Sequence, residues 1–280
     1  MMTLNCQLEM TRIVRSSFQR LTLLRAALRK VSSAFGRYTP PMYAKDLLAL
    51  DALELLPRVI HDAGEVNPTF SALGMELPGP LFAEAPANWA GRVTSRPEDA
   101  LGSVFLAPPY KMKRLMPLMR QMQDFGVIAA GIDFSLLEGA GDTRPRSAAE
   151  LTELKDAVGV PFVVAGVLDP RDAELAAEAG AEVIIACSSL SEFLGGPSLV
   201  SLVADIRDAV GDTLLFARGG LRSGADVLRY LALGADAVVV PGSLNPHRIL
   251  EQLAHGMRVT GCAGLEEISY DLIFQPMFTD

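Results

Sequence analysis

The chain has 280 residues, half of them hydrophobic and 21% charged, which excludes a disordered protein and is enough for an enzyme-sized core. Its formal net charge of −8 argues against a general attraction to nucleic acid or to anionic membranes. The charge is unevenly spread, because residues 1–45 carry +7 and residues 46–280 carry −15. We therefore expect a basic leader followed by an acidic globular part.

The leader, residues 1–40, is predicted to be a basic amphipathic arm. Between 11 and 34, apolar residues recur near helical spacing with arginines between them. Such a helix packs on its own protein or on a second subunit; a membrane-surface helix and an organelle transit peptide are the alternatives. The arginines interrupt each apolar stretch, so we expect no secretory signal and no transmembrane segment.

Three cysteines, Cys6, Cys187 and Cys262, lie far apart and lack CxxC spacing. Neither a disulfide framework nor a structural zinc site is predicted from them, and a cytoplasmic location is the simplest expectation. A buried, small hydrophobic role is expected for Cys187, which follows an apolar run.

After the arm, residues 41–80 form a pre-barrel segment rich in Pro and Gly, with a short hairpin expected within 73–80. From 81 to 280, apolar strands alternate with helical patterns, which predicts a parallel sheet with right-handed crossovers. The expected strands cover 81–85, 103–107, 127–132, 161–165, 182–187, 213–217 and 236–240. The expected helices cover 112–125, 147–157, 170–180, 198–210, 224–233 and 246–260.

These elements indicate an α/β fold of the TIM type, a (β/α)8 barrel, but the spacing accounts for seven strands rather than eight. Between 85 and 103 too few residues remain for further crossovers, each of which needs about 10 to 12 residues. We therefore expect a barrel that is shortened or irregular between its first and third strands. An incomplete barrel exposes strand edges, so we expect the 11–34 helix or a second copy of the chain to cover the gap.

The strongest local signal for ligand binding follows the strand at 213–217. Arg218 precedes the pair Gly219 and Gly220, and Arg222 stands just before a predicted helix. Glycines let backbone N–H groups approach an anion, and a helix N-terminus adds partial positive charge. The next strand also ends in a glycine turn, whose Gly242 and Ser243 complete the predicted phosphate site. The alternative is that these glycines serve only as tight turns.

These residues carry a resemblance. The stretch from Gly219 to Gly224, with the residues that follow it to 237, is similar to the strand-seven phosphate motif of the FMN-dependent α-hydroxy acid oxidase and dehydrogenase family, which includes glycolate and lactate oxidases. Residues 57–66, 80–83 and 261–268 resemble other segments of that family. The resemblance covers roughly residues 55–275 and implies a TIM barrel that binds FMN.

The departures from the family pattern concern its chemistry. The resemblance places a lysine after strand five, where this chain has Ala165, and a catalytic histidine after strand six, where it has Ser188. The substrate-binding arginine is replaced by Ser191, and the family's Gly-Arg phosphate contact becomes Pro241-Gly242. Arg218 stands in place of an aspartate. A positioned base contributes about 10²- to 10⁴-fold to proton removal, so we expect no ordinary 2-hydroxy acid oxidation.

No other histidine is an obvious substitute. His61 precedes the barrel and His255 lies in a predicted helix, while His247, just after the last strand, is the one that could face the ligand end. For Arg218 two interpretations stand side by side. It could supply the positive charge near the flavin that Ala165 does not, or it could pair with Asp133 or another barrel acid.

Two hypotheses of different classes follow. In the first, the chain is a divergent flavoprotein that binds FMN or another phosphate-bearing ligand at the loops after strands seven and eight, without a catalytic residue of the usual kind. In the second, it is a non-catalytic barrel that serves as a binding or assembly subunit. Both predict a small-molecule or protein partner rather than nucleic acid, and association of copies into a homo-oligomer.

Overall fold

The computed structural model describes residues 43–58, 60–61, 64–84, 102–125, 127–136 and 144–274. The chain divides into two compact units, residues 1–44 and 45–280. Almost everything described belongs to the second unit. The predicted arm at 1–40 and its helix at 11–34 lie outside the described residues.

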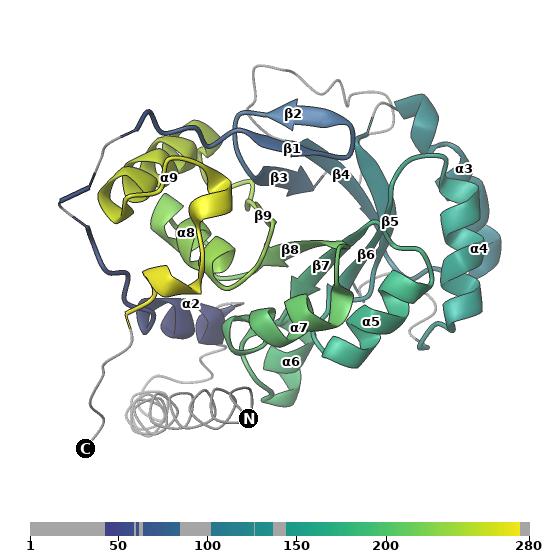
Figure 1. The fold of residues 1–280 in the computed structure, drawn as a ribbon. Helices are drawn as coiled ribbons and strands as arrows, with labels where there is room; N and C mark the ends of the chain where they lie inside the picture. The colour runs from purple at the N-terminus through teal and green to yellow at the C-terminus, as the bar shows by residue number, and fades with distance from the viewer. Residues whose placement is uncertain are drawn as a thin grey trace, which may run out of the picture. The chain divides into compact units, whose positions relative to one another are not determined.

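The centre of the second unit is a closed barrel of seven parallel strands (Figure 1). The strands are β3 (Leu81–Glu84), β4 (Gly102–Ala107), β5 (Ala129–Asp133), β6 (Phe162–Val167), β7 (Val183–Cys187), β8 (Leu214–Arg218) and β9 (Ala237–Val239). Each strand pairs with its successor in the chain, and β9 pairs with β3 to close the ring. The seven strands predicted from apolar runs are confirmed to within two residues at each end.

The shortened barrel is closed. The prediction that it exposes strand edges is therefore wrong for the described strands. β3 pairs directly with β4, with Phe82 opposite Gly102, so the ring has no gap at the point where the interval was too short for a crossover. A side chain at position 102 would place its Cβ 2.4 Å from the Phe82 ring, so glycine is what lets these two strands approach. The second strand of an eight-stranded barrel is therefore omitted without leaving an edge among the described strands.

Helices cover the outer face of the barrel (Figure 1). They are α2 (Ala44–Asp51), α3 (Met112–Arg120), α4 (Ala148–Val158), α5 (Pro170–Glu178), α6 (Ser189–Leu194), α7 (Val203–Val210), α8 (Gly224–Ala232) and α9 (Pro246–Thr260). The six predicted helices are found, although 3-10 turns form the end of the first (Met122–Phe125) and the start of the fourth (Leu199–Ser201). Helices α2 and α6 were not predicted, because each is eight residues or shorter and has little periodic pattern.

Local sequence signals explain where the predicted helices begin and end. Ser147 and Glu150 form a capping box at the start of α4, and Gly159 ends that helix in the left-handed conformation. Asn245 caps α9 through its side chain, with Pro246 at the first helical position.

Apolar side chains fill the barrel from one end. The strands β1 (Phe70–Ala72) and β2 (Met75–Leu77) form the predicted hairpin, displaced slightly toward the N-terminus. Phe70 of this hairpin contacts Phe82 and Phe216 edge-on, with ring centroids 6.0 and 6.5 Å apart. A second apolar layer lies between the strands and the helices and is the larger part of the core.

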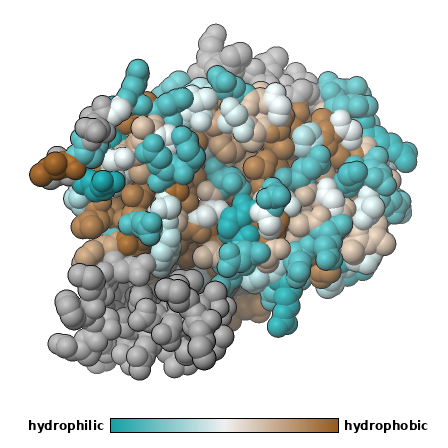
Figure 2. Space-filling model, in the orientation of Figure 1, coloured by the Kyte–Doolittle hydropathy of each residue, from teal (hydrophilic) through white to brown (hydrophobic). Residues whose placement is uncertain are grey.

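The outer surface of the molecule carries both polar and apolar side chains. Polar and apolar groups are interspersed over the face seen in Figure 2. Among the described helices, none is long and apolar enough to cross a bilayer.

Candidate functional site

The carboxyl ends of the seven parallel strands meet at one mouth of the barrel, which is where such folds place their ligand sites. Inward-pointing positions at this mouth carry Glu84 from β3, Asp133 from β5 and Arg218 from β8. Cys187 ends β7 at the same level, paired in register with Arg218. The mouth therefore contains charged groups, whereas the opposite end of the barrel interior is apolar.

Arg218 is held by two carboxylates. Its Nη1 donates to Asp133 Oδ2 at 2.6 Å and to Glu84 Oε1 at 2.5 Å, and its Nη2 donates to Ser135 Oγ at 2.6 Å. Burial alone would lower the pKa of Arg218, but the hydrogen bond and charge of Asp133, with further contributions from Cys187 and Glu84, raise it above its ordinary value. The pairing with Asp133 that the sequence left as one alternative is confirmed.

One N–H group of the Arg218 guanidinium has no hydrogen-bond partner among the described residues. It is the N–H of the Nε atom, which is buried. A buried N–H without an acceptor costs free energy, so this atom is a donor that a ligand oxygen or water at the mouth would satisfy. Position 165, where the resemblance places a lysine, carries a fully buried alanine that offers no charge there.

The glycine turn after β8 has a conformation that requires glycine. Gly219 has φ of 152° and Gly220 has φ of 63°, and both residues are buried. The hydroxyl of Tyr230 donates to the carbonyl of Gly219 at 2.8 Å and fixes the turn to α8. Within the described part of the chain, no group accepts a hydrogen bond from the backbone N–H of Gly219 or Gly220. Two successive backbone N–H groups without an acceptor are donors that an anion can use.

The predicted helix start after this turn is confirmed, and its own side chains satisfy it. Ser223 and Asp226 form a capping box at the N-terminus of α8. The carboxylate of Asp226, only 1% exposed, also accepts from the N–H of Arg222 at 3.0 Å. Gly224 N–H donates to Gln252 of α9 at 3.0 Å. The helix N-terminus is thus less available to an anion than the glycine turn before it.

Arg222, the predicted phosphate-binding cation, is paired with α2. Its two terminal nitrogens donate to Asp51 at 2.6 and 3.1 Å. The hydrogen bonds that Arg222 donates to Asp51, followed by its contacts with Asp226, raise the pKa of Arg222, and the same pairing lowers the pKa of Asp51. Gly242 and Ser243, at the end of the neighbouring strand β9, are exposed, and a Cβ added at Gly242 would meet nothing within 4 Å.

Ser188, at the position where the resemblance places a histidine, has a partner that sequence reasoning missed. It is fully buried, and its hydroxyl donates to Asp46 Oδ2 of α2 at 2.5 Å. The N–H of Leu199 donates to the other oxygen of Asp46 at 2.7 Å. Burial raises the pKa of Asp46 to about 6, although both hydrogen bonds oppose that shift. No local pattern relates residues 46 and 188, which are 142 positions apart.

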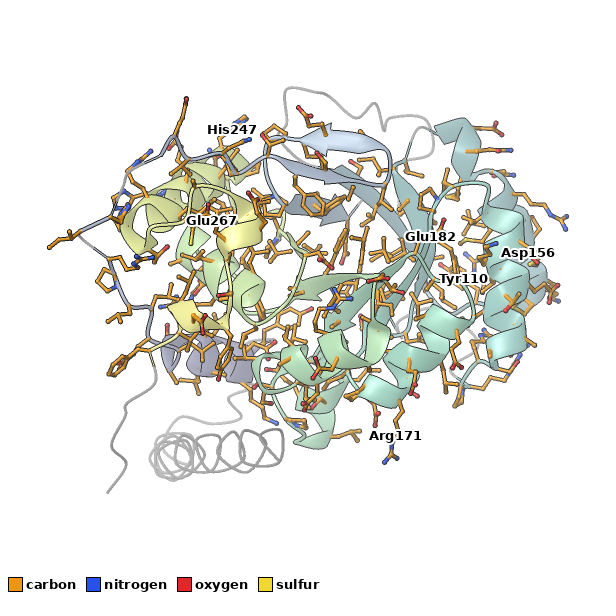
Figure 3. All side chains as sticks on the ribbon, in the orientation of Figure 1. Tyr110, Asp156, Arg171, Glu182, His247 and Glu267 are labelled. Atoms are coloured by element: carbon orange, nitrogen blue, oxygen red, sulfur yellow. The ribbon has the colours of Figure 1, made fainter. Side chains whose placement is uncertain are left out.

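The remaining candidates are Ser191 and the three histidines. Ser191 donates to the carbonyl of Pro197 at 2.7 Å. His247 is exposed at the start of α9 (Figure 3). His61 contacts the carbonyl of Arg258 at 3.1 Å, and His255 lies on α9. Among the described residues, no group of three or more His, Cys, Asp or Glu side chains is placed to hold a metal ion.

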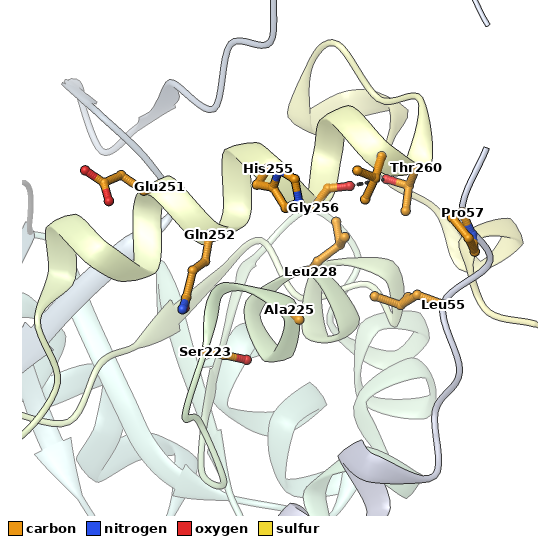
Figure 4. A pocket seen from close by; sticks show the side chains of 11 residues that line it. Leu55, Pro57, Ser223, Ala225, Leu228, Glu251, Gln252, His255, Gly256 and Thr260 are labelled. Atoms are coloured by element: carbon orange, nitrogen blue, oxygen red, sulfur yellow. Dashed lines mark hydrogen bonds between the residues drawn. The ribbon is translucent and has the colours of Figure 1, made fainter. Parts of the chain in front are cut away.

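A separate groove of about 560 Å³ lies outside the barrel between α8 and α9 (Figure 4). Its walls include Leu228, Gly256 and Val259, and Leu55 and Pro57 come from the segment before the hairpin. The groove borders Ser223 at one end, but its lining includes no residue of the barrel strands. It is therefore distinct from the mouth.

Comparison with known proteins places this geometry in a family. The model of the FMN-dependent dehydrogenase family matches residues 94–245, more than half of the chain. An L-lactate dehydrogenase of Caulobacter vibrioides is 30% identical over 230 residues, covering 77% of this chain and 55% of that protein. An L-lactate dehydrogenase of Ectopseudomonas mendocina is also 30% identical, over 223 residues, 71% of this chain and 58% of that protein. The chain thus spans little more than half the length of these curated relatives.

Solved structures agree on the fold. A mandelate oxidase structure superposes with a TM-score of 0.66 at 20% identity, covering 82% of this chain and 89% of that one. A Pediococcus acidilactici protein described as a lactate oxidase gives a TM-score of 0.69 at 18% identity, covering 83% and 86%. Because the family model covers more than half of the chain and relatives 30% identical cover over two thirds of it, this chain belongs to the family of FMN-dependent dehydrogenases.

Proposed function

We propose that the chain binds FMN at the mouth of its barrel, with the phosphate on the backbone N–H groups of Gly219 and Gly220. The observation that carries this proposal is that both glycines are buried and that neither N–H group has an acceptor among the described residues. A phosphate oxygen is the kind of acceptor that such a pair of N–H groups fits. Gly242 and Ser243, on the turn after the adjacent strand β9, would supply the outer side of the same site.

The flavin ring, when bound, supplies the two-electron redox chemistry of the cofactor. This chain's part would be to orient the ring from the mouth, where the Nε atom of Arg218 would donate to a ring acceptor. The charge of Arg218 is already balanced by Asp133 and Glu84, so the residue would provide a hydrogen bond more than a net positive charge. Exchange of Arg218 for Ala should therefore weaken flavin retention, and an unchanged affinity would remove this role.

We further propose that the chain does not oxidise 2-hydroxy acids by the route that uses a histidine base. The hydroxyl of Ser188 points to Asp46 and is fully buried, so it is already engaged. Ser191 is likewise engaged with a backbone carbonyl, so the two positions offer neither a base nor a cation for a carboxylate substrate. Anaerobic addition of L-lactate to the FMN-loaded protein tests this directly: the flavin absorbance should persist, and rapid bleaching would refute it.

A non-catalytic barrel remains the second candidate. It is favoured by the internal pairing of both arginines that were predicted to face the ligand, Arg218 with two acids and Arg222 with Asp51. A purified protein that takes up no FMN would support it. We also propose a cytoplasmic location and association of copies, which cell fractionation and light scattering would test.

A further inference from the structure

Helix α2 contacts two residues of the predicted phosphate site, Gly220 and Arg222. A Cβ at Gly220 would lie 2.8 Å from the Cβ of Asp46 and 3.0 Å from the backbone N of Leu47, so α2 packs directly on the glycine turn. One turn and a half further along the helix, Asp51 holds the guanidinium of Arg222. α2 thus covers one side of the turn and binds its neighbouring cation.

The contact between Asp51 and Arg222 has the form of a ligand contact. Two oxygens of Asp51 accept from two terminal nitrogens of Arg222, the bidentate arrangement that a phosphate also makes with arginine. The side chains are 56% and 44% exposed, so this pair can exchange with a ligand from solvent. The second partner of Arg222, Asp226, cannot leave in this way, because it is 1% exposed and fixed by the capping box.

The rest of α2 is anchored more firmly than Asp51. Asp46 is buried against Ser188 and the N–H of Leu199, and Lys45 contributes contacts to Glu192 and to the carbonyl of Gly196. Exchange at Asp51 therefore needs only a side-chain rotation, with the helix in place.

We propose that Asp51 is an internal competitor of the phosphate: its carboxylate occupies Arg222 when the site is empty and is displaced when a phosphate-bearing ligand binds. The inference rests on the proposed function, since it assumes that a phosphate reaches the turn after β8. Under this inference, Asp51 sets the affinity of the site for the phosphate group. The flavin ring, bound elsewhere in the mouth, should not sense it.

The test compares FMN with riboflavin, which has the same ring and no phosphate. Binding of each to the full chain is followed by quenching of flavin fluorescence, in the wild type and in Asp51→Asn. The control is Asp156→Asn, which removes an exposed carboxylate from α4. We expect Asp51→Asn to tighten FMN binding about three- to tenfold, because removing an exposed competitor and one negative charge each contribute a small factor. Riboflavin binding should be unchanged, and the control should alter neither.

The outcomes separate the two proposals. If the wild type binds FMN and Asp51→Asn binds it equally or more weakly, the competitor role is overturned while the proposed function stands; weaker binding would mean that Asp51 positions Arg222 for the phosphate. If Asp51→Asn tightens riboflavin as much as FMN, the effect is not on the phosphate and the inference fails. If no variant binds FMN, the proposed function falls and takes this inference with it.

Discussion

Asp46 offers a prediction whose size follows from the structure. Its carboxylate is fully buried, with Ser188 and the N–H of Leu199 as hydrogen-bond donors and with Glu192 and Lys45 as the charged neighbours that act on it. Burial raises its pKa from 3.8 to about 6. Between these pH values the folded state holds a proton that the unfolded state has lost, so the free energy of unfolding falls as pH rises.

The magnitude follows from that difference in pKa. It corresponds to about 3 kcal/mol, which is present below pH 3.8 and fully lost above about pH 6. Asp46→Asn keeps the shape and the acceptor for Leu199 but cannot ionise. We therefore expect the wild type to lose stability relative to Asp46→Asn between pH 4 and 6, and the difference to stay constant from pH 7 to 8.

Urea denaturation of both proteins across pH 4 to 8, followed by circular dichroism, measures this difference. Asp51→Asn is a useful control, because pairing with Arg222 lowers the pKa of Asp51. The contribution of ionised Asp51 to the free energy of unfolding is therefore complete above its unfolded pKa and should not change with pH over the upper part of this range. If the stability of the wild type relative to Asp46→Asn rises with pH instead, ionised Asp46 is the stabilised form and the reasoning from burial is wrong.

Two further substitutions test the mouth and the turn. Arg218→Met leaves Asp133 buried without its counter-ion and should cost about 3 to 5 kcal/mol of unfolding free energy. The control Arg207→Met, at a partly exposed ion pair, should cost about 1 kcal/mol. Equal losses of the two variants in thermal or urea unfolding would contradict the buried ion-pair network. Gly220→Ala forces a positive φ and a contact with α2, so we expect a loss of about 1 to 3 kcal/mol, while Gly242→Ala should stay within about 0.5 kcal/mol. A harmless Gly220→Ala would mean that α2 does not pack on the turn.

The sequence contained enough local information to predict the barrel strands and most of its helices. The structure confirms the apolar runs at β7 and β9 and the helix start at Ser223. Each of these signals is contained in a few consecutive residues. Helices α2 and α6 were missed because short segments lack a readable period. Closure of the ring between β3 and β4 depends on Gly102 meeting Phe82, a fit in three dimensions that spacing does not reveal.

For the candidate site, the residue types could be predicted and their partners could not. The glycine turn and Arg218 were identified from their place after a strand. That Arg218 would meet Glu84 from a strand 134 positions earlier follows from barrel closure, not from any motif. The roles of Asp46 and Asp51 were invisible for the same reason, since α2 reaches the turn after β8 only in the folded chain.

The central claim is that the turn after β8 holds the phosphate of FMN, and flavin retention tests it most directly. The full chain is incubated with excess FMN, passed through gel filtration, and examined for flavin absorbance in the protein peak. We predict retained flavin approaching one FMN per chain, with less in an Arg218→Ala variant. A colourless protein peak after this treatment would contradict the claim and favour the non-catalytic barrel.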